Sequence, residues 1–154
     1  MTMPRAKKPA EQRSDRSRRW VAVYWIMAVV ALVGLADATF LTVAHLTGDD
    51  AVCGSLAGCS AVLGSSYATT LGLPTAAFGA VAYFAVFSAA ILAAFGHNWV
   101  RGILIALISL MFVASLYFLS LQAFVLHAFC PFCLLSAALT FFLTGLLLVI
   151  PSRR

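Results

Sequence analysis

Charged side chains are scarce in this sequence. Asp, Glu, Lys and Arg make up 10% of the 154 residues, whereas 63% of the residues are hydrophobic. A water-soluble globule of this size needs more polar surface than that. The sequence also has no glycine-rich phosphate loop, no HExxH and no GxSxG motif, so the soluble enzyme classes that carry them are excluded. The composition predicts an integral membrane protein.

The basic residues do not form a nucleic-acid-binding face. The net charge is +5, but the ten Lys and Arg residues fall in the terminal tails and in one short turn. A folded basic surface would be needed to follow a phosphate backbone. Membrane topology therefore explains the charge better than a nucleic-acid partner does.

Four apolar stretches approach or exceed the roughly 20 residues that cross a bilayer as a helix. We expect transmembrane helices at residues 20–46, 74–95, 102–126 and 130–150, a disordered cytoplasmic tail at 1–19 and a second tail at 151–154. Between the first two helices, residues 47–73 form an extracytoplasmic loop in which Ser60 to Leu63 can lie on the membrane as a short surface helix. The predicted fold class is all-α: a single four-transmembrane-helix bundle.

The positive charge fixes the predicted orientation. If the N-terminus is cytoplasmic, the tail, the turn at Arg101 and the C-terminal arginines share one side, and that side holds every Lys and Arg. A cleaved signal peptide ending near Ala36–Ala38 is the alternative, but the apolar run continues to Leu46, beyond a typical signal sequence. We therefore expect a multi-pass protein of the cell inner or plasma membrane with both termini in the cytoplasm.

All four cysteines then lie on the outer, oxidising side, where disulfides form and persist. Cys53 and Cys59 are in the loop, and Cys130 and Cys133 are where the fourth helix begins. Four cysteines allow three pairings. The spacing favours a loop pair, Cys53/Cys59, and a CxxC pair, Cys130/Cys133.

The CxxC motif suits thiol exchange. We expect Cys130 to be the N-cap, Pro131 the first helical residue and Cys133 part of the first turn, so that unpaired backbone N–H groups and the helix dipole stabilise a thiolate. Positions i and i+3 share a helix face, which permits a reversible disulfide. Cys133 lies deeper, where an apolar electron acceptor can reach it, and the Gly-containing loop pair can serve as a mobile relay.

Other readings of the cysteines remain open. One or both pairs could be structural disulfides in a non-enzymatic membrane assembly or transport module. Four thiolates could also hold a metal ion, although no second-shell residues for such a site stand out.

The order of several short motifs resembles bacterial homologues of vitamin K epoxide reductase (VKOR), from about Gly34 to the end of the fourth helix. These motifs are the loop pair, the run Cys59-Ser60-Ala61-Val62-Leu63-Gly64-Ser65-Ser66-Tyr67, then Gly72-Leu73-Pro74, Phe78-Gly79 and Cys130-Pro131-Phe132-Cys133. The disulfide-bond protein B family does similar chemistry on four helices, but there the CxxC motif precedes the loop pair. The order here favours the VKOR family.

The resemblance implies roles for particular residues. It implies a quinone inside the bundle, with Cys133 facing it, Cys130 as the resolving cysteine and Ser65 as a polar residue beside it. It implies that Cys53 and Cys59 shuttle electrons from an extracytoplasmic thioredoxin-like or DsbA-like protein, so that the enzyme supports disulfide formation.

Two departures from the family pattern refine these expectations. The sequence shows no fused thioredoxin-like domain, which predicts a separate partner protein. Leu134-Leu135-Ser136-Ala137 follows the CxxC motif where vertebrate enzymes have Thr-Tyr-Ala. Menaquinone or ubiquinone is therefore favoured over an epoxide as the acceptor.

Three further ionisable residues each allow two interpretations. Asp37 lies within the first predicted helix and is either functional or a neutral carboxyl that supports helix packing. His45 and His127 lie near the outer interface and are either proton donors to a reduced quinone or ordinary interfacial side chains.

Overall fold

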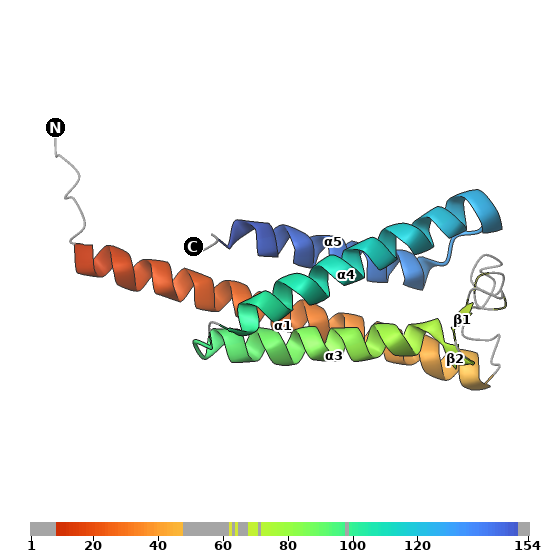
Figure 1. The fold of residues 1–154 in the computed structure, drawn as a ribbon, viewed down its shortest axis with the longest axis horizontal. Coiled ribbons are helices and arrows are strands. Elements are labelled where there is room, and N and C mark those ends of the chain that lie inside the picture. Colours follow the sequence, from red (N-terminus) through yellow and green to blue (C-terminus); the bar gives the residue numbers. More distant parts are fainter. Residues whose placement is uncertain are drawn as a thin grey trace.

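The computed structural model describes residues 9–47, 62, 64, 68–70, 72–97 and 99–150. Figure 1 shows the order of its elements along the chain. These are α1 (Pro9–Thr47), β1 (Thr69–Thr70), β2 (Leu73–Pro74), α3 (Thr75–Ala94), α4 (Val100–Ser120), the π-helical segment η3 (Leu121–Leu126) and α5 (Pro131–Val149).

The predicted membrane bundle is confirmed. Within the described part of the chain, four helical stretches are long and apolar enough to cross a membrane: Arg18–Thr47, Thr75–Ala94, Val100–Leu126 and Pro131–Val149. Their ends lie within a few residues of those expected from the sequence. Large apolar side chains such as Val81, Val113 and Leu148 are exposed on the outside of the bundle, as a lipid solvent requires.

The first helix begins earlier than expected. Segment 1–19 was predicted to be disordered, but α1 is helical from Pro9 onward and extends beyond the rest of the bundle (Figure 1). The prediction of disorder is therefore wrong for residues 9–19, whereas residues 1–8 lie outside the described part. The reason is that a helix already formed in the span gains one hydrogen bond per added residue without a new nucleus, and Glu, Gln and Arg are good helix formers.

A short antiparallel hairpin was not expected. Thr69 pairs with Pro74 and Thr70 pairs with Leu73, and Gly72 between them has a positive φ of 79°. Two-residue strands are too short to give an alternating hydrophobic pattern, so the sequence showed only a loop. Pro74 ends β2 and is the N-cap of α3, so the helix itself starts at Thr75 rather than at Pro74.

Small residues allow the helices to approach closely. The core includes Ala28 and Ala31 of α1 and Ala90 of α3, all nearly inaccessible. The tightest approach is at Gly34, where a Cβ atom would lie 2.6 Å from Cδ1 of Tyr83. Gly34 thereby creates the space in which the buried Tyr83 ring lies.

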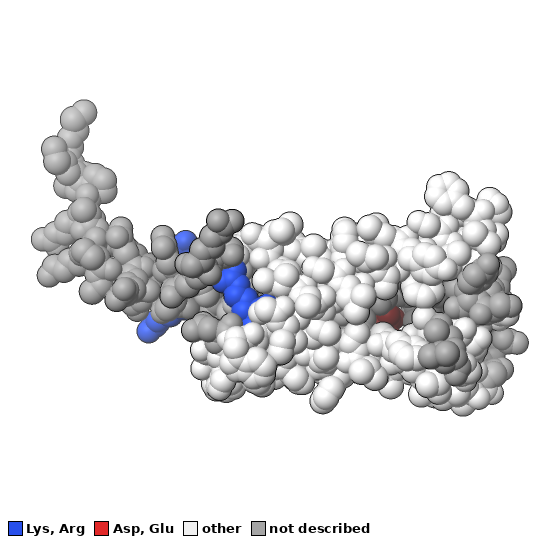
Figure 2. Space-filling view, viewed as in Figure 1, with Lys and Arg blue, Asp and Glu red and all other residues white. Residues whose placement is uncertain are grey.

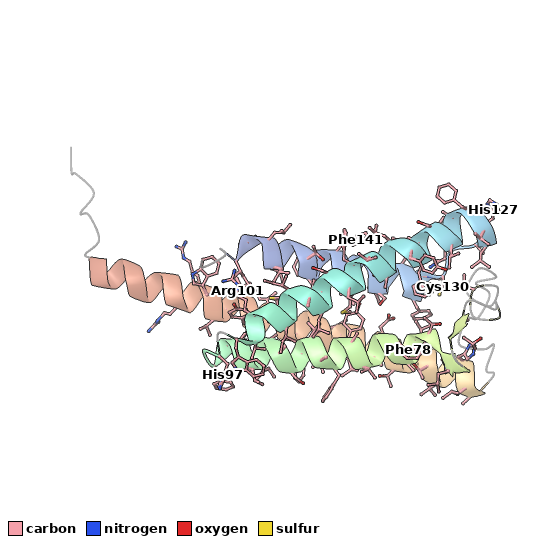
Figure 3. The ribbon with its side chains drawn as sticks, viewed as in Figure 1. Phe78, His97, Arg101, His127, Cys130 and Phe141 are labelled. Atoms are coloured by element: carbon pink, nitrogen blue, oxygen red, sulfur yellow. The ribbon has the colours of Figure 1, made fainter. Side chains whose placement is uncertain are left out.

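The two ends of the bundle differ in chemistry. The described basic side chains, Arg18, Arg19 and Arg101, gather at the end where α1 emerges and α4 begins (Figure 2). Arg101 Nη2 also donates to the carbonyl of Ile150 at 3.1 Å, which ties the start of α4 to the end of α5. Cys130 and His127 lie at the opposite end (Figure 3).

Candidate active site

The CxxC pair is built into the first turn of α5. Cys130 is the N-cap, with extended backbone angles of φ −91° and ψ 120°, Pro131 follows at the start of the helix, and the Leu134 N–H donates to the Cys130 carbonyl at 3.0 Å. This is the local structure expected from the sequence. Both cysteines are free thiols, Cys130 fully buried and Cys133 partly exposed.

The two thiols interact directly. The Cys133 thiol donates a hydrogen bond to the Cys130 sulfur, and this bond is the main reason that the pKa of Cys130 falls below its ordinary value. Burial opposes the shift, whereas the backbone N–H groups of Cys133 and Phe132 support it. Cys130, one residue before the span, is therefore predisposed to be a thiolate while Cys133 keeps its proton.

Gln122 positions the backbone of Cys130, and sequence reasoning missed it. Its Oε1 atom accepts the Cys130 N–H at 3.0 Å, and its side chain is 3% exposed. Its carbonyl accepts the Ala128 N–H at 3.2 Å, where the π-helical segment ends and His127 adopts a left-handed φ of 47°. The signal in the sequence was the only amide side chain of the third span, since such a polar group inside a membrane indicates a functional or pairing role.

The aromatic residue of the motif fixes α5 against α1. The ring of Phe132 lies 5.5 Å from that of Phe40, measured between centroids and tilted by 50°. Cys130 itself packs against Val62, Phe132 and Cys133. The buried cysteine is thus surrounded by apolar groups, while Cys133 is turned toward the interior of the bundle.

A cavity of about 330 Å³ opens inside the bundle beside Cys133. Its volume lies within the range of small-molecule sites, about 300–1,000 Å³. All four transmembrane helices contribute to it, and its wall is predominantly apolar. Besides Cys133, its polar lining consists of His45, Thr75, Tyr83, Ser115, Gln122, Ser136 and Thr140.

Three hydroxyl groups, from Tyr83, Ser136 and Thr140, form a hydrogen-bonded cluster in this wall. The Tyr83 hydroxyl lies 2.9 Å from the Ser136 carbonyl oxygen, 3.0 Å from Ser136 Oγ and 3.1 Å from Thr140 Oγ1. Thr140 Oγ1 can also donate to the Ser136 carbonyl, at 3.0 Å. Because Ser136 follows Cys133 by three residues, its hydroxyl lies on the same side of α5 as the thiol.

The structure describes some of the predicted site residues and not others. Cys53, Cys59 and Ser65, together with all but Val62 of the expected surface helix, lie outside the described residues, so their roles stay predictions. His45 lines the cavity, whereas His127 is exposed at the end of η3. Asp37 is buried, and the next residue, Ala38, lines the cavity.

The bundle, the cysteine pair and the cavity can now be compared with known families. A sequence model described as the vitamin K epoxide reductase family matches residues 25–148, a range that contains Cys130, Cys133 and every cavity residue. This family comprises membrane oxidoreductases that are generally associated with quinones. The match confirms the resemblance seen in the sequence and supports a membrane redox role. The chain belongs to the vitamin K epoxide reductase family.

Proposed function

We propose that the protein is a quinone-dependent thiol oxidoreductase that supports disulfide-bond formation outside the cytoplasm. The observation that carries this proposal is the position of Cys133, which lies on the wall of a 330 Å³ cavity and is hydrogen-bonded to Cys130. A dithiol that reaches an apolar cavity within a membrane bundle can reduce an acceptor dissolved in lipid.

The residues around the cavity fit a quinone head group. The apolar wall suits a planar ring, and the Ser136 hydroxyl can donate a hydrogen bond to a carbonyl oxygen. A bound quinone supplies a two-electron acceptor. Menaquinone and ubiquinone are the proposed forms.

The cysteines divide the chemistry between them. In the reduced pair, the Cys130 thiolate accepts the Cys133 proton, so that Cys133 becomes the thiolate that would donate electrons to the acceptor. As the Cys130 sulfur bonds to the Cys133 sulfur, Cys130 releases that proton toward the acceptor and the electron pair leaves Cys133 for the acceptor, which closes the Cys130–Cys133 disulfide. One disulfide forms for each two electrons that leave the sulfurs.

Electrons reach this pair through the loop. In the proposed path, Cys53 and Cys59 receive them from a separate extracytoplasmic thioredoxin-like or DsbA-like protein and reduce the Cys130–Cys133 disulfide by exchange. Both termini are cytoplasmic in this arrangement. The basic end formed by Arg18, Arg19 and Arg101 supports that orientation, because basic residues favour the cytoplasmic side.

The test is reduction of a soluble quinone by purified protein, with dithiothreitol as electron donor and absorbance as the readout. We expect Cys133→Ala to abolish turnover. Leu134→Ala, at an exposed position next to it, is the control and should retain turnover. Full activity of Cys133→Ala would refute the mechanism.

A second measurement separates an enzyme from a membrane module with structural disulfides. In cells whose quinone synthesis is blocked, a working relay accumulates reduced cysteines, which alkylation by a mass-tagged maleimide reveals. A structural disulfide would remain oxidised under the same conditions.

A further inference from the structure

Asp37 is a buried carboxyl group in which one oxygen makes no hydrogen bond. Its side chain is 8% exposed, and Oδ2 has no hydrogen-bond partner. In Figure 2 an acidic surface is visible at the bottom of a hollow, and Asp37 is the only acidic residue among the described side chains. A carboxylate without a partner is costly inside a membrane, whereas a carboxylic acid is much less so. The site therefore suits a group that carries a proton.

Asp37 is close enough to the redox centre to interact with it electrostatically. It is one helical turn beyond Gly34, against which Tyr83 packs, and the next residue, Ala38, lines the cavity. Its charge interacts electrostatically with Tyr83, Cys130 and Cys133. An ionised Asp37 disfavours a thiolate at Cys130, although less strongly than the hydrogen bond from Cys133 favours it.

Quinone reduction by the dithiol requires a source of two protons at this site. Closing the disulfide while reducing a quinone requires two protons on the acceptor. If Cys130 is already a thiolate, the dithiol supplies only the one proton of Cys133. A second proton has to come from another group beside the cavity or from water.

We propose that Asp37 holds this second proton and gives it up when the Cys130–Cys133 disulfide closes. This proposal rests on the proposed function. Before the step the site contains a Cys130 thiolate, a Cys133 thiol and a protonated Asp37. Afterwards it contains an S–S bond and an ionised Asp37. Two electrons and two protons have gone to the quinone, and the single negative charge has moved from Cys130 to Asp37.

The other titratable groups beside the cavity are less suited to this role. The Tyr83 hydroxyl is already engaged with Ser136 and Thr140. His45 also lines the cavity and is the competing proton donor among the described residues. It lies two turns further along α1 than Asp37, toward the end of the helix. The test therefore includes a variant of each.

The decisive measurement needs no quinone. Infrared difference spectra are recorded on purified protein that is reduced with a phosphine and then oxidised with diamide. We expect a carboxylic-acid C=O band in the reduced state that is replaced by carboxylate bands on oxidation. Asp37→Asn should remove this signal and Asp37→Glu should shift it. His45→Gln and Thr39→Asn, a polar substitution at an exposed position of α1, should leave it in place.

Kinetics supply a second, separate readout. Asp37→Asn should slow quinone reduction by about 10²-fold or more, as expected for loss of a general acid, while dithiothreitol reduces the Cys130–Cys133 disulfide at the wild-type rate. A difference band that survives Asp37→Asn would overturn the proposal, as would a carboxyl signal that is the same in both redox states. If the wild-type protein failed to reduce quinones, the proposed function would fall, yet the infrared result would still decide whether Asp37 exchanges a proton with the dithiol.

Discussion

Gln122→Leu tests whether one side chain holds the redox centre in place. The Cys130 N–H, which donates to Gln122 Oε1 at 3.0 Å, belongs to a residue with no exposed surface. Leucine has a similar volume, so the substitution removes the acceptor without leaving a large void. An unsatisfied buried donor costs about 1–3 kcal/mol. We therefore expect the free energy of unfolding to fall by about that amount.

The expected change in melting temperature follows from that cost. For a chain of this size, about 2–4 °C are lost per kcal/mol, so the reduced Gln122→Leu protein should melt about 2–12 °C below the wild type. The assay is thermal unfolding in detergent with a fluorogenic maleimide, in a Cys53→Ser/Cys59→Ser background. Only Cys130 and Cys133 can then react with the maleimide, and the fluorescence increases as unfolding of the bundle exposes them.

Ser120→Ala is the matched control for this experiment. The Ser120 hydroxyl donates to the Leu116 carbonyl at 2.8 Å, but it is exposed, and its loss leaves no buried donor without a partner. We expect a change within about 0.5 kcal/mol. If Gln122→Leu melted at the temperature of this control, with unchanged thiol reactivity, the Gln122 hydrogen bond would not be what positions Cys130.

Two further predictions concern packing and pH. Gly34→Ala brings a Cβ atom against the Tyr83 ring, so the free energy of unfolding, measured by thermal unfolding, should fall by about 1–3 kcal/mol. Gly102 has open space around it, so Gly102→Ala should be neutral or slightly stabilising. Equal effects of the two substitutions would contradict the close approach at Gly34. The pKa of Cys130 is lower in the folded protein than in the unfolded chain. At pH values between these two pKa values, the folded protein therefore binds fewer protons than the unfolded chain. The melting temperature of the reduced protein should therefore rise with pH across that window and be highest above it. Cys130→Ser should remove this rise, and a slope that persisted in the variant would assign it to another group.

The helices and one cysteine pair were predictable because they depend on local sequence. Apolar runs of span length and the clustering of Lys and Arg predicted the four spans, and the described basic side chains do gather at one end of the bundle. The order Cys130-Pro131-Phe132-Cys133 predicted an N-cap cysteine, since proline suits the first helical position. The early start of α1 and the hairpin at residues 69–74 were missed, because helix extension and two-residue strands leave little pattern in the sequence.

The tertiary structure decided which residues come together at the site. The sequence determined that this protein is a membrane bundle with a CxxC pair at one end, because hydropathy and spacing act over short distances. It could not determine that Gln122 contacts Cys130, that Tyr83 lies against Gly34, or that a buried oxygen of Asp37 has no hydrogen-bond partner. These relations join residues on different helices. Which faces meet is decided only when small and large side chains pack together in three dimensions.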